Sequence, residues 1–228
     1  MNCLRSLEFI KKIDKKYKKF GLDVILIHPP EWNFEKDRKN IIYSLKKYGI
    51  RFPVIIDKDK KIIKKLRINF WPTQILIRDG KILYKHIKEG NYKKLENAII
   101  NTLKIKTKRI FKEEPKYSKF PTLYLGKRKQ KKVIYFNNRW IQKKEYLKSI
   151  KNNSSFTLLT KGRVINFVAE SLSKKPIKIS IKINNKNIKN FTINKPQLYS
   201  IIRLKNNKKQ KLTLVTKRDL AIYSFSFQ

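Results

Sequence analysis

Cys3 is the only thiol in the 228-residue sequence, and it stands where a helical pattern begins. The N-terminal end of a helix carries unpaired N–H groups and a positive partial charge, and both favour a thiolate. A thiolate at this position would perform nucleophilic or disulfide-exchange chemistry. A free cysteine is also often a small buried hydrophobic residue, so the position of Cys3 alone leaves both interpretations open.

A second candidate is Trp71-Pro72-Thr73, which directly precedes an apolar stretch that is typical of a central strand. Proline cannot donate to a strand ladder, and a cis peptide bond at the start of the strand would explain its presence. An ordinary strand-start proline is the alternative. Glu31 follows the apolar stretch 24–28 in a loop, where it could tune a thiol pKa or relay a proton, or could be a solvated loop charge.

The remaining side chains do not favour other chemistry. His28 and His86 are isolated and are expected to be structural, and no His, Cys or carboxylate pair has metal-ligand spacing. The chain has six glycines and no glycine-rich phosphate loop. We therefore expect neither a metal nor a cofactor.

The first half of the chain alternates between helical and strand patterns. Leu7, Ile10, Ile13, Tyr17 and Phe20 are spaced three or four apart, which predicts a helix over 4–20 that ends at Gly21. The pattern then predicts a buried strand at 24–28, a helix at 36–48, a strand at 52–57, a short helix at 59–66, a hairpin over 70–87 around Asp79-Gly80 and a last helix capped by Asn91. This order favours an α/β domain with a mixed sheet over about residues 1–106.

The second half of the chain has a linker followed by strand patterns. Residues 107–120 are polar and charged and are interpreted as a linker. From 121 onward, short segments alternate apolar and polar residues, most clearly at 176–184 and 220–227, and Asn184-Asn185 marks a turn. Several such strands predict a β-sandwich over 121–228.

Several motifs follow one another in an order that a known family shares. They are HPPEWNFEKD at 28–37, GIRFPVIIDKD at 49–59, NFWPTQILI at 69–77, GNY at 90–92, PTLYLG at 121–126, KPQLYSIIR at 195–203 and AIYSFSF at 221–227. Together with Asn2-Cys3, which fits the second half of a Cys-x-Asn-Cys motif, they resemble the thioredoxin superfamily. The resemblance is to the C-terminal region of the DipZ-type proteins of cytochrome c biogenesis and thiol-disulfide exchange, and it covers nearly the whole chain.

This resemblance implies a thioredoxin-like domain followed by an all-β, jelly-roll-like sandwich. It implies a redoxin that exchanges thiols and disulfides outside the cytoplasm, in the periplasm, with protein substrates and a membrane electron donor. Cys3 would be the resolving thiol, Pro72 with Thr73 would form the substrate loop, and Trp71 would pack beside the site. The ligand of a carbohydrate-binding-like sandwich is not implied.

The sequence departs from that family at its start. The first cysteine of the motif and the strand before it are missing, so the chain as written cannot cycle an internal disulfide. Either Met1 is an internal codon and the functional chain continues upstream, or the chain is a truncated, inactive remnant. We expect the first, because the other patterns of the domain agree with one another. The sequence also contains no signal peptide and no apolar run of membrane-spanning length.

Two other functions compete with thiol-disulfide exchange. The sandwich could bind a glycan or a protein, and exposed aromatic side chains such as Trp140 or Tyr199 would support this. The net charge of +42 could instead indicate a polyanion binder. The excess is mostly lysine spread along the chain, in a sequence that is also rich in Ile and Asn. This composition is what AT-rich codons supply, so nucleic-acid binding is not expected.

Overall fold

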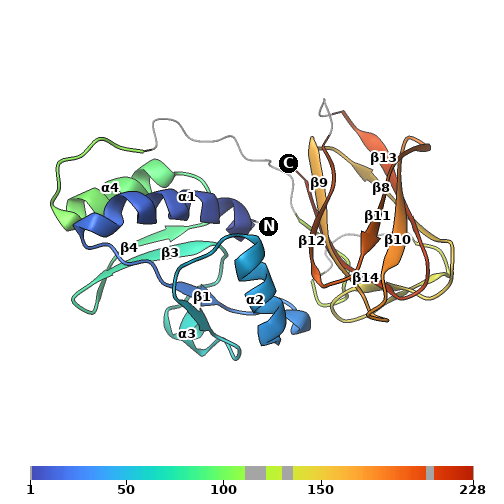
Figure 1. Ribbon diagram of the computed structural model, residues 1–228, viewed down its shortest axis with the longest axis horizontal. Coiled ribbons are helices and arrows are strands. Elements are labelled where there is room, and N and C mark those ends of the chain that lie inside the picture. The colour runs from blue at the N-terminus through green and yellow to red at the C-terminus, as the bar shows by residue number, and fades with distance from the viewer. Residues whose placement is uncertain (1, 111–121, 130–135, 204–207, 228) are drawn as a thin grey trace. The chain divides into compact units, whose positions relative to one another are not determined.

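The computed structural model describes residues 2–110, 122–129, 136–203 and 208–227 (Figure 1). The chain forms two compact units, Met1–Tyr117 and Ser118–Gln228. Met1, Pro121 and residues 111–120 of the predicted linker lie outside the described residues.

The α-helices of the first unit lie close to where the apolar spacing predicts them, whereas the short helix Asn33–Lys36 was not predicted. The described helices are α1 (Asn2–Tyr17), η1 (Lys18–Phe20), η2 (Asn33–Lys36), α2 (Arg38–Lys47), α3 (Lys61–Lys65) and α4 (Tyr92–Leu103). Gly21 ends the first helical segment with a φ of 89°, a left-handed conformation that glycine adopts without strain. Asn91 precedes α4, but its side chain makes no capping hydrogen bond, so the predicted cap is wrong. Asn91 is itself left-handed, with a φ of 51°, whereas a capping residue has extended backbone.

The strands of the first unit form two separate pairs. Strand β1 (Leu26–His28) pairs in parallel with β2 (Val54–Ile56), and β3 (Thr73–Arg78) pairs antiparallel with β4 (Lys81–Ile87). Asp79 and Gly80 join the second pair with φ values of 50° and 71°, as a two-residue hairpin requires. Among the described residues no strand joins β1 to β3 by hydrogen bonds, so the predicted single mixed sheet is not observed. The predicted burial of strand 24–28 is also wrong, because β1 is only half-buried.

The core of the first unit lies where helices α1 and α4 meet the β3–β4 hairpin (Figure 1). Its buried members are Ile10, Ile13, Tyr17, Leu76, Tyr92, Leu95 and Ile99. The hydroxyl of Tyr17 donates to the buried carboxylate of Glu96 at 2.5 Å, which joins α1 to α4. Desolvation and the Glu96 carboxylate raise the pKa of Tyr17, so the phenol stays protonated as a donor. This arrangement fixes α1, and with it Cys3.

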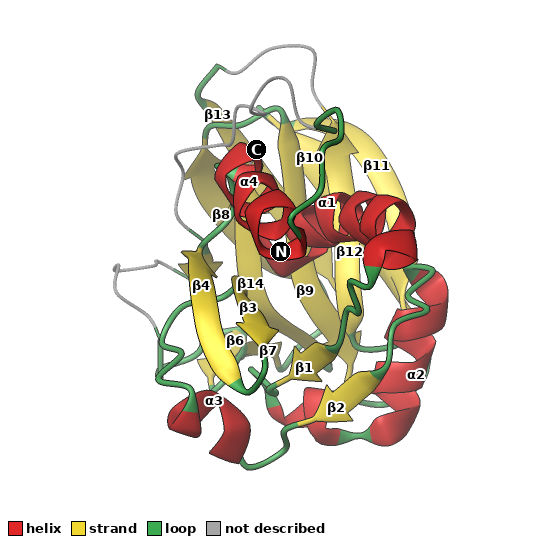
Figure 2. Ribbon diagram, turned by 90° about the vertical axis from the view of Figure 1, so that its left-hand side faces the viewer, coloured by secondary structure: helices red, strands yellow, loops and turns green. Residues whose placement is uncertain are grey.

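The described second unit consists of strands alone. They are β5 (Leu123–Tyr124), β6 (Trp140–Gln142), β7 (Leu147–Ser149), β8 (Ser154–Thr160), β9 (Val164–Ser171), β10 (Ile177–Ile183), β11 (Lys186–Ile193), β12 (Gln197–Arg203), β13 (Gln210–Thr216) and β14 (Leu220–Phe227). They form a four-stranded sheet in the order β11-β10-β13-β8 and a six-stranded sheet that contains β12-β9-β14-β7-β6, with β5 beside β14. All strand pairs in both sheets are antiparallel, and Figure 2 shows the two sheets in yellow.

Residues from both sheets contribute to one core. The alternation predicted for 176–184 is confirmed, because Ile177, Ile179, Ile181 and Ile183 of β10 are all buried. The one-face pattern predicted for 220–227 is wrong, because β14 is buried on both faces. A register shift between Ile222 and Ser224 accompanies this two-sided burial.

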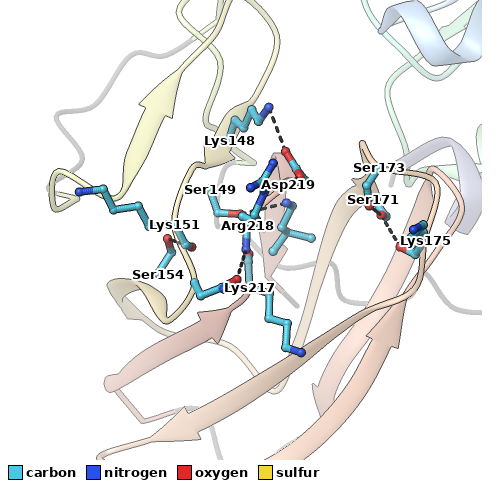
Figure 3. A network of polar contacts seen from close by, with 12 residues as sticks. Lys148, Ser149, Lys151, Ser154, Ser171, Ser173, Lys175, Lys217, Arg218 and Asp219 are labelled. Carbon is cyan, nitrogen blue, oxygen red and sulfur yellow. Dashed lines mark hydrogen bonds and ion pairs between the residues drawn. The ribbon is translucent and has the colours of Figure 1, made fainter.

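A polar network ties the ends of several strands of the second unit together (Figure 3). The Ser149 hydroxyl donates to the carbonyl of Lys217 at 2.8 Å and accepts from the N–H of Leu220 at 2.9 Å. Asp219 pairs with Lys148 at 3.0 Å, and this hydrogen bond is the main reason that its pKa is lowered. Both contacts fix the turn that leads into β14.

Candidate functional site

Cys3 lies in the first turn of α1 and is exposed. Although the residue is exposed, desolvation is the largest cause that raises the pKa of its thiol. The carboxylates of Glu31 and Glu35 raise it further, while a backbone hydrogen bond lowers it. The surroundings therefore favour the neutral thiol, which is the opposite of the thiolate expected at a helix N-terminus.

The loop before β3 contains a cis peptide bond between Trp71 and Pro72, as the position of the proline indicated. The Thr73 hydroxyl donates to the carbonyl of Phe70 at 2.6 Å, and the carbonyl of Pro72 accepts from the N–H of Lys88 at 2.8 Å. The ammonium group of Lys60 lies 5.3 Å from the Trp71 ring centre, within cation–π range. These contacts hold the loop from both sides.

Two side-chain contacts tie the first turns of α1 to the region of this loop. The amide of Gln74, two residues after Pro72, donates to the Ser6 hydroxyl at 2.8 Å. Arg5 forms a two-pronged ion pair with Glu89, with N–O distances of 2.7 Å and 2.5 Å, and Glu89 follows Lys88 at the end of β4. Cys3 therefore belongs to the same end of the unit as Pro72, although 69 residues separate them in sequence.

Glu31 and Glu35 belong to the loop and short helix that follow β1. The carboxylate of Glu35 accepts from the N–H of Glu31 at 2.5 Å and from the N–H of Trp32 at 3.2 Å. Desolvation raises the pKa of Glu35 to about 7, and the neighbouring charge of Glu31 adds to this shift. The structure thus brings two carboxylates into the electrostatic range of Cys3, one of which the sequence analysis did not select.

The other predicted residues have structural surroundings. His28 points Nε2 toward the carbonyl of Glu35 at 3.2 Å, and desolvation lowers its pKa. His86 is buried, with Nε2 2.7 Å from the carbonyl of Gly90. Trp140 is buried in the second core, and Tyr199 is partly buried against it. Neither ring offers the exposed platform that a sugar-binding face would use.

The described ranges show neither a membrane-spanning helix nor a cluster of metal-binding side chains. No helix there is long and apolar enough to span a membrane, and no three His, Cys, Asp or Glu side chains gather as a metal ion would require.

The sequence analysis did not select Arg5, Ser6, Glu35, Gln74 or Glu89, all of which belong to this site. Glu35 carries a weak local signal. It stands three residues after Trp32, the residue that caps η2, and an acidic side chain at this position can reach back to free N–H groups. Arg5 and Glu89 carry no such signal, since 84 residues separate the two partners.

Comparisons with known proteins assign the chain to the thioredoxin-like class of proteins. Residues 103–227 match the family described as "Thioredoxin like C-terminal domain". This match covers more than half of the chain, so the chain belongs to that family, and it is a thioredoxin-like region of the DipZ type.

Curated relatives agree with this assignment. The chain is 31% identical over 104 residues to the Arabidopsis thaliana protein SUPPRESSOR OF QUENCHING 1, chloroplastic. It is 33% identical over 101 residues to protein DipZ of Mycobacterium tuberculosis, and 33% over 98 residues to the thiol-disulfide oxidoreductase ResA of Bacillus anthracis. These matches cover 45%, 43% and 42% of this chain, but only 10%, 14% and 54% of the three relatives.

One similar solved structure is that of a family two carbohydrate esterase from Clostridium thermocellum in complex with cellohexaose. The match covers 42% of this chain and 31% of the esterase chain. Its identity is 14% and its TM-score 0.38, too low to support an argument about fold or ligand.

Proposed function

We propose that this chain takes part in thiol-disulfide exchange, with Cys3 as the exchanging thiol and the Trp71-Pro72-Thr73 loop as the seat of the substrate peptide. The observation that carries the proposal is the pair of contacts, Ser6 with Gln74 and Arg5 with Glu89, that hold the start of α1 at the cis-proline end of the unit. The similarity to the thiol-disulfide oxidoreductase ResA supports the same chemistry.

The exchange balances as follows. The thiolate of Cys3 attacks one sulfur of a protein disulfide, a new S–S bond forms to Cys3, and the other sulfur leaves as a thiolate that takes up a proton. A second thiol then breaks the mixed disulfide in the same way. In a complete Cys-x-Asn-Cys motif the roles would be divided: the cysteine directly before Met1 would attack first, and Cys3 would resolve the mixed disulfide.

The partners follow from this chemistry. We propose protein thiols and disulfides as substrates, a membrane electron donor as the source of reducing equivalents, and an extracytoplasmic, periplasmic setting. We also propose that the second unit is a jelly-roll-like β-sandwich. What supports this is a core built by residues of both antiparallel sheets.

The test of the site uses a disulfide-bonded peptide and a small disulfide side by side. The purified chain should form a mixed disulfide with the peptide, seen as a mass increase, and Cys3→Ser should form none. Pro72→Ala should slow the reaction with the peptide by about tenfold, because the loop orients the peptide, while the reaction with 2,2′-dithiodipyridine changes by less than about twofold. Equal slowing of both reactions, or of neither, would contradict the assignment of the loop.

A second test rebuilds the dithiol. One cysteine added before Met1 gives Cys-Met-Asn-Cys, and one serine added there is the matched control. The cysteine-extended chain should catalyse the reduction of insulin by dithiothreitol, whereas the serine-extended chain should not. Equal rates of insulin reduction by the two chains would contradict the proposed exchange function.

A further inference from the structure

The segment that follows α4 turns back along the helix (Figure 1). Two contacts fix its far end. The N–H of Ile110 donates to the buried carboxylate of Glu96 at 2.6 Å, and the ammonium group of Lys16 donates to the carbonyl of Lys108. Ile105 and Ile110 also pack against the core of the first unit. The segment is therefore held against α4 at both of its ends.

A cavity of about 570 Å³ lies between this segment and α4. The helix contributes Asn97, Ile100 and Asn101 to its lining, and the segment contributes Lys106 and Arg109 among others. Pockets for small organic ligands have volumes of roughly 300–1,000 Å³, whereas one water molecule occupies about 30 Å³. The cavity is therefore large enough for an organic molecule and much larger than a single ion needs.

The charged side chains that line the cavity are both cationic. They are Lys106 and Arg109, and no Asp or Glu side chain is among the lining residues. In the described part of the chain neither of the two forms an ion pair with a carboxylate. Two positive charges without a counter-charge match a dianionic group, and a phosphate monoester carries about −1.5 to −2 at neutral pH. A guanidinium group binds such a phosphate through two parallel hydrogen bonds, and an ammonium group binds it as a point charge.

Uncharged groups complete the lining. Asn97 and Asn101 are four residues apart, so their amides lie on the same face of α4, and Thr107 adds a hydroxyl. The Oδ1 atom of Asn97 is buried and has no hydrogen-bond partner, so no bond through this atom opposes a rotation of the amide toward a ligand. Ile100 and Ile105 supply apolar surface for the organic part of the ligand.

The C-terminal end of a helix disfavours anions, because its last carbonyl groups carry a partial negative charge. In α4 these carbonyl groups already accept hydrogen bonds. The carbonyl of Ile100 accepts from the N–H of Ile105 at 3.3 Å, and that of Asn101 accepts from the N–H of Lys104 at 3.2 Å. The carbonyl of Thr102 accepts from the guanidinium group of Arg78. The two cations of the cavity are therefore the stronger electrostatic influence on a ligand.

We propose that the cavity between α4 and the segment that follows it binds an organic phosphate, a phosphate monoester on a body of nucleoside size. Lys106 and Arg109 bind the phosphate, the amides of Asn97 and Asn101 bind polar groups of the body, and Ile100 with Ile105 contacts its apolar surface. The cavity shares no residue with the cis-proline loop or with Cys3. The inference therefore goes beyond thiol-disulfide exchange and does not depend on it.

The experiment titrates the full chain with three probes and follows the binding by ¹H–¹⁵N NMR spectra at about 150 mM KCl, where long-range attraction is screened. The probes are adenosine 5′-monophosphate, adenosine and inorganic phosphate. We expect the monophosphate to bind at least about tenfold more tightly than either of the others, because only this probe contacts both the cations and the apolar surface. The side-chain amide signals of Asn97 and Asn101 should shift. Equal affinities for the monophosphate and for inorganic phosphate, or shifts confined to other parts of the chain, would overturn the inference.

Two matched variants separate this site from the general attraction of a chain with a net charge of +42. Arg109→Gln should weaken binding of the monophosphate about tenfold or more, because it removes charge-assisted hydrogen bonds. Lys108→Gln removes one charge from the same segment outside the cavity lining, and should weaken binding by less than about threefold. Equal weakening by the two variants would overturn the inference. Arg109 and Lys108 are both exposed, so neither variant should unfold the chain, and circular dichroism checks this.

Discussion

The two units of this protein differ in the size of their cores and in the extent of their sheets. Among the described residues, the second unit has twenty buried apolar side chains in one core, whereas the main core of the first unit has seven. The sheets differ in the same way, since the described part of the first unit contains two pairs of strands and that of the second contains a four-stranded and a six-stranded sheet. Two-stranded sheets are marginal in isolation, so the first unit relies on its helices and side-chain contacts.

The two units also differ in how many large apolar side chains they expose. In the first unit, Ile55 and Ile56 of β2, Ile77 of β3 and Leu83 of β4 lie on strands and are all exposed. The second unit exposes few large apolar side chains in its described part, of which Leu159 is the most exposed at 84%. The unit with the smaller core contains the candidate functional site. Regions with few buried apolar contacts open locally at a low free-energy cost, so we expect the first unit to open more readily than the second.

The largest effect should come from the second core. Phe167→Ala removes a fully buried ring that stacks on Phe225 with ring centres 5.5 Å apart, and should lower the free energy of unfolding of the second unit by about 3–5 kcal/mol. Urea unfolding followed by hydrogen exchange, resolved by peptide, reads the two units separately. Leu159→Ala is the control and should change this free energy by less than about 0.5 kcal/mol. Unfolding of the first unit in the Phe167→Ala chain would show that the two units are not independent.

Local sequence patterns predicted much of both units. The spacing of Ile10, Ile13 and Tyr17 placed α1, Asp79-Gly80 placed the hairpin, and the alternating isoleucines placed β10, because each of these signals acts within a few residues. The two-sided burial of β14 escaped prediction, since it depends on what covers the second face of a sheet. The absence of a described strand between β1 and β3 was also not readable from local patterns.

The candidate site was only partly predictable for the same reason. Cys3 and Pro72 could be selected by their residue types and local positions. The burial that gives Glu35 its raised pKa depends on tertiary packing, as does the ion pair of Arg5 with Glu89. Sequence reasoning therefore selected Glu31, whose position in the loop is similar.

The stability of the first unit should also depend on pH through Glu35. The pKa of Glu35 is raised to about 7 in the folded chain, so the folded state binds this proton more tightly than the unfolded state. The contribution of Glu35 to stability therefore falls as pH rises from about 4.5 to about 7, by at most about 3 kcal/mol. His28 acts in the opposite direction, because its lowered pKa costs stability as pH falls below its unfolded value.

The difference between Glu35→Gln and the unmodified chain isolates the carboxyl of Glu35. The variant should match the unmodified chain near pH 4.5 and be more stable above pH 7, in the first unit alone. Peptide-resolved hydrogen exchange at both pH values measures this. A pH-independent difference, or one located in the second unit, would contradict both the assignment and the independence of the units.

The smallest effect concerns the contact that compensates for the small core of the first unit. Arg5 and Glu89 expose only 21% and 12% of their side chains, so their ion pair is poorly screened by water. Arg5→Ala should destabilise the first unit by about 1–2 kcal/mol and leave the second unit unchanged. Glu8→Ala breaks a pair whose carboxylate is 69% exposed, and should cost less than about 0.5 kcal/mol.

The same variant also tests whether this ion pair positions the start of α1. Arg5→Lys keeps the charge but cannot form the two parallel hydrogen bonds, so it should recover only part of the lost stability. If Arg5 positions Cys3 beside the cis-proline loop, Arg5→Ala should slow mixed-disulfide formation with a peptide more than with a small disulfide, as Pro72→Ala does. If it only stabilises the fold, both rates should stay unchanged under conditions where the variant remains folded. The contact of Ser6 with Gln74, rather than the ion pair, would then hold the start of α1 near the cis-proline loop.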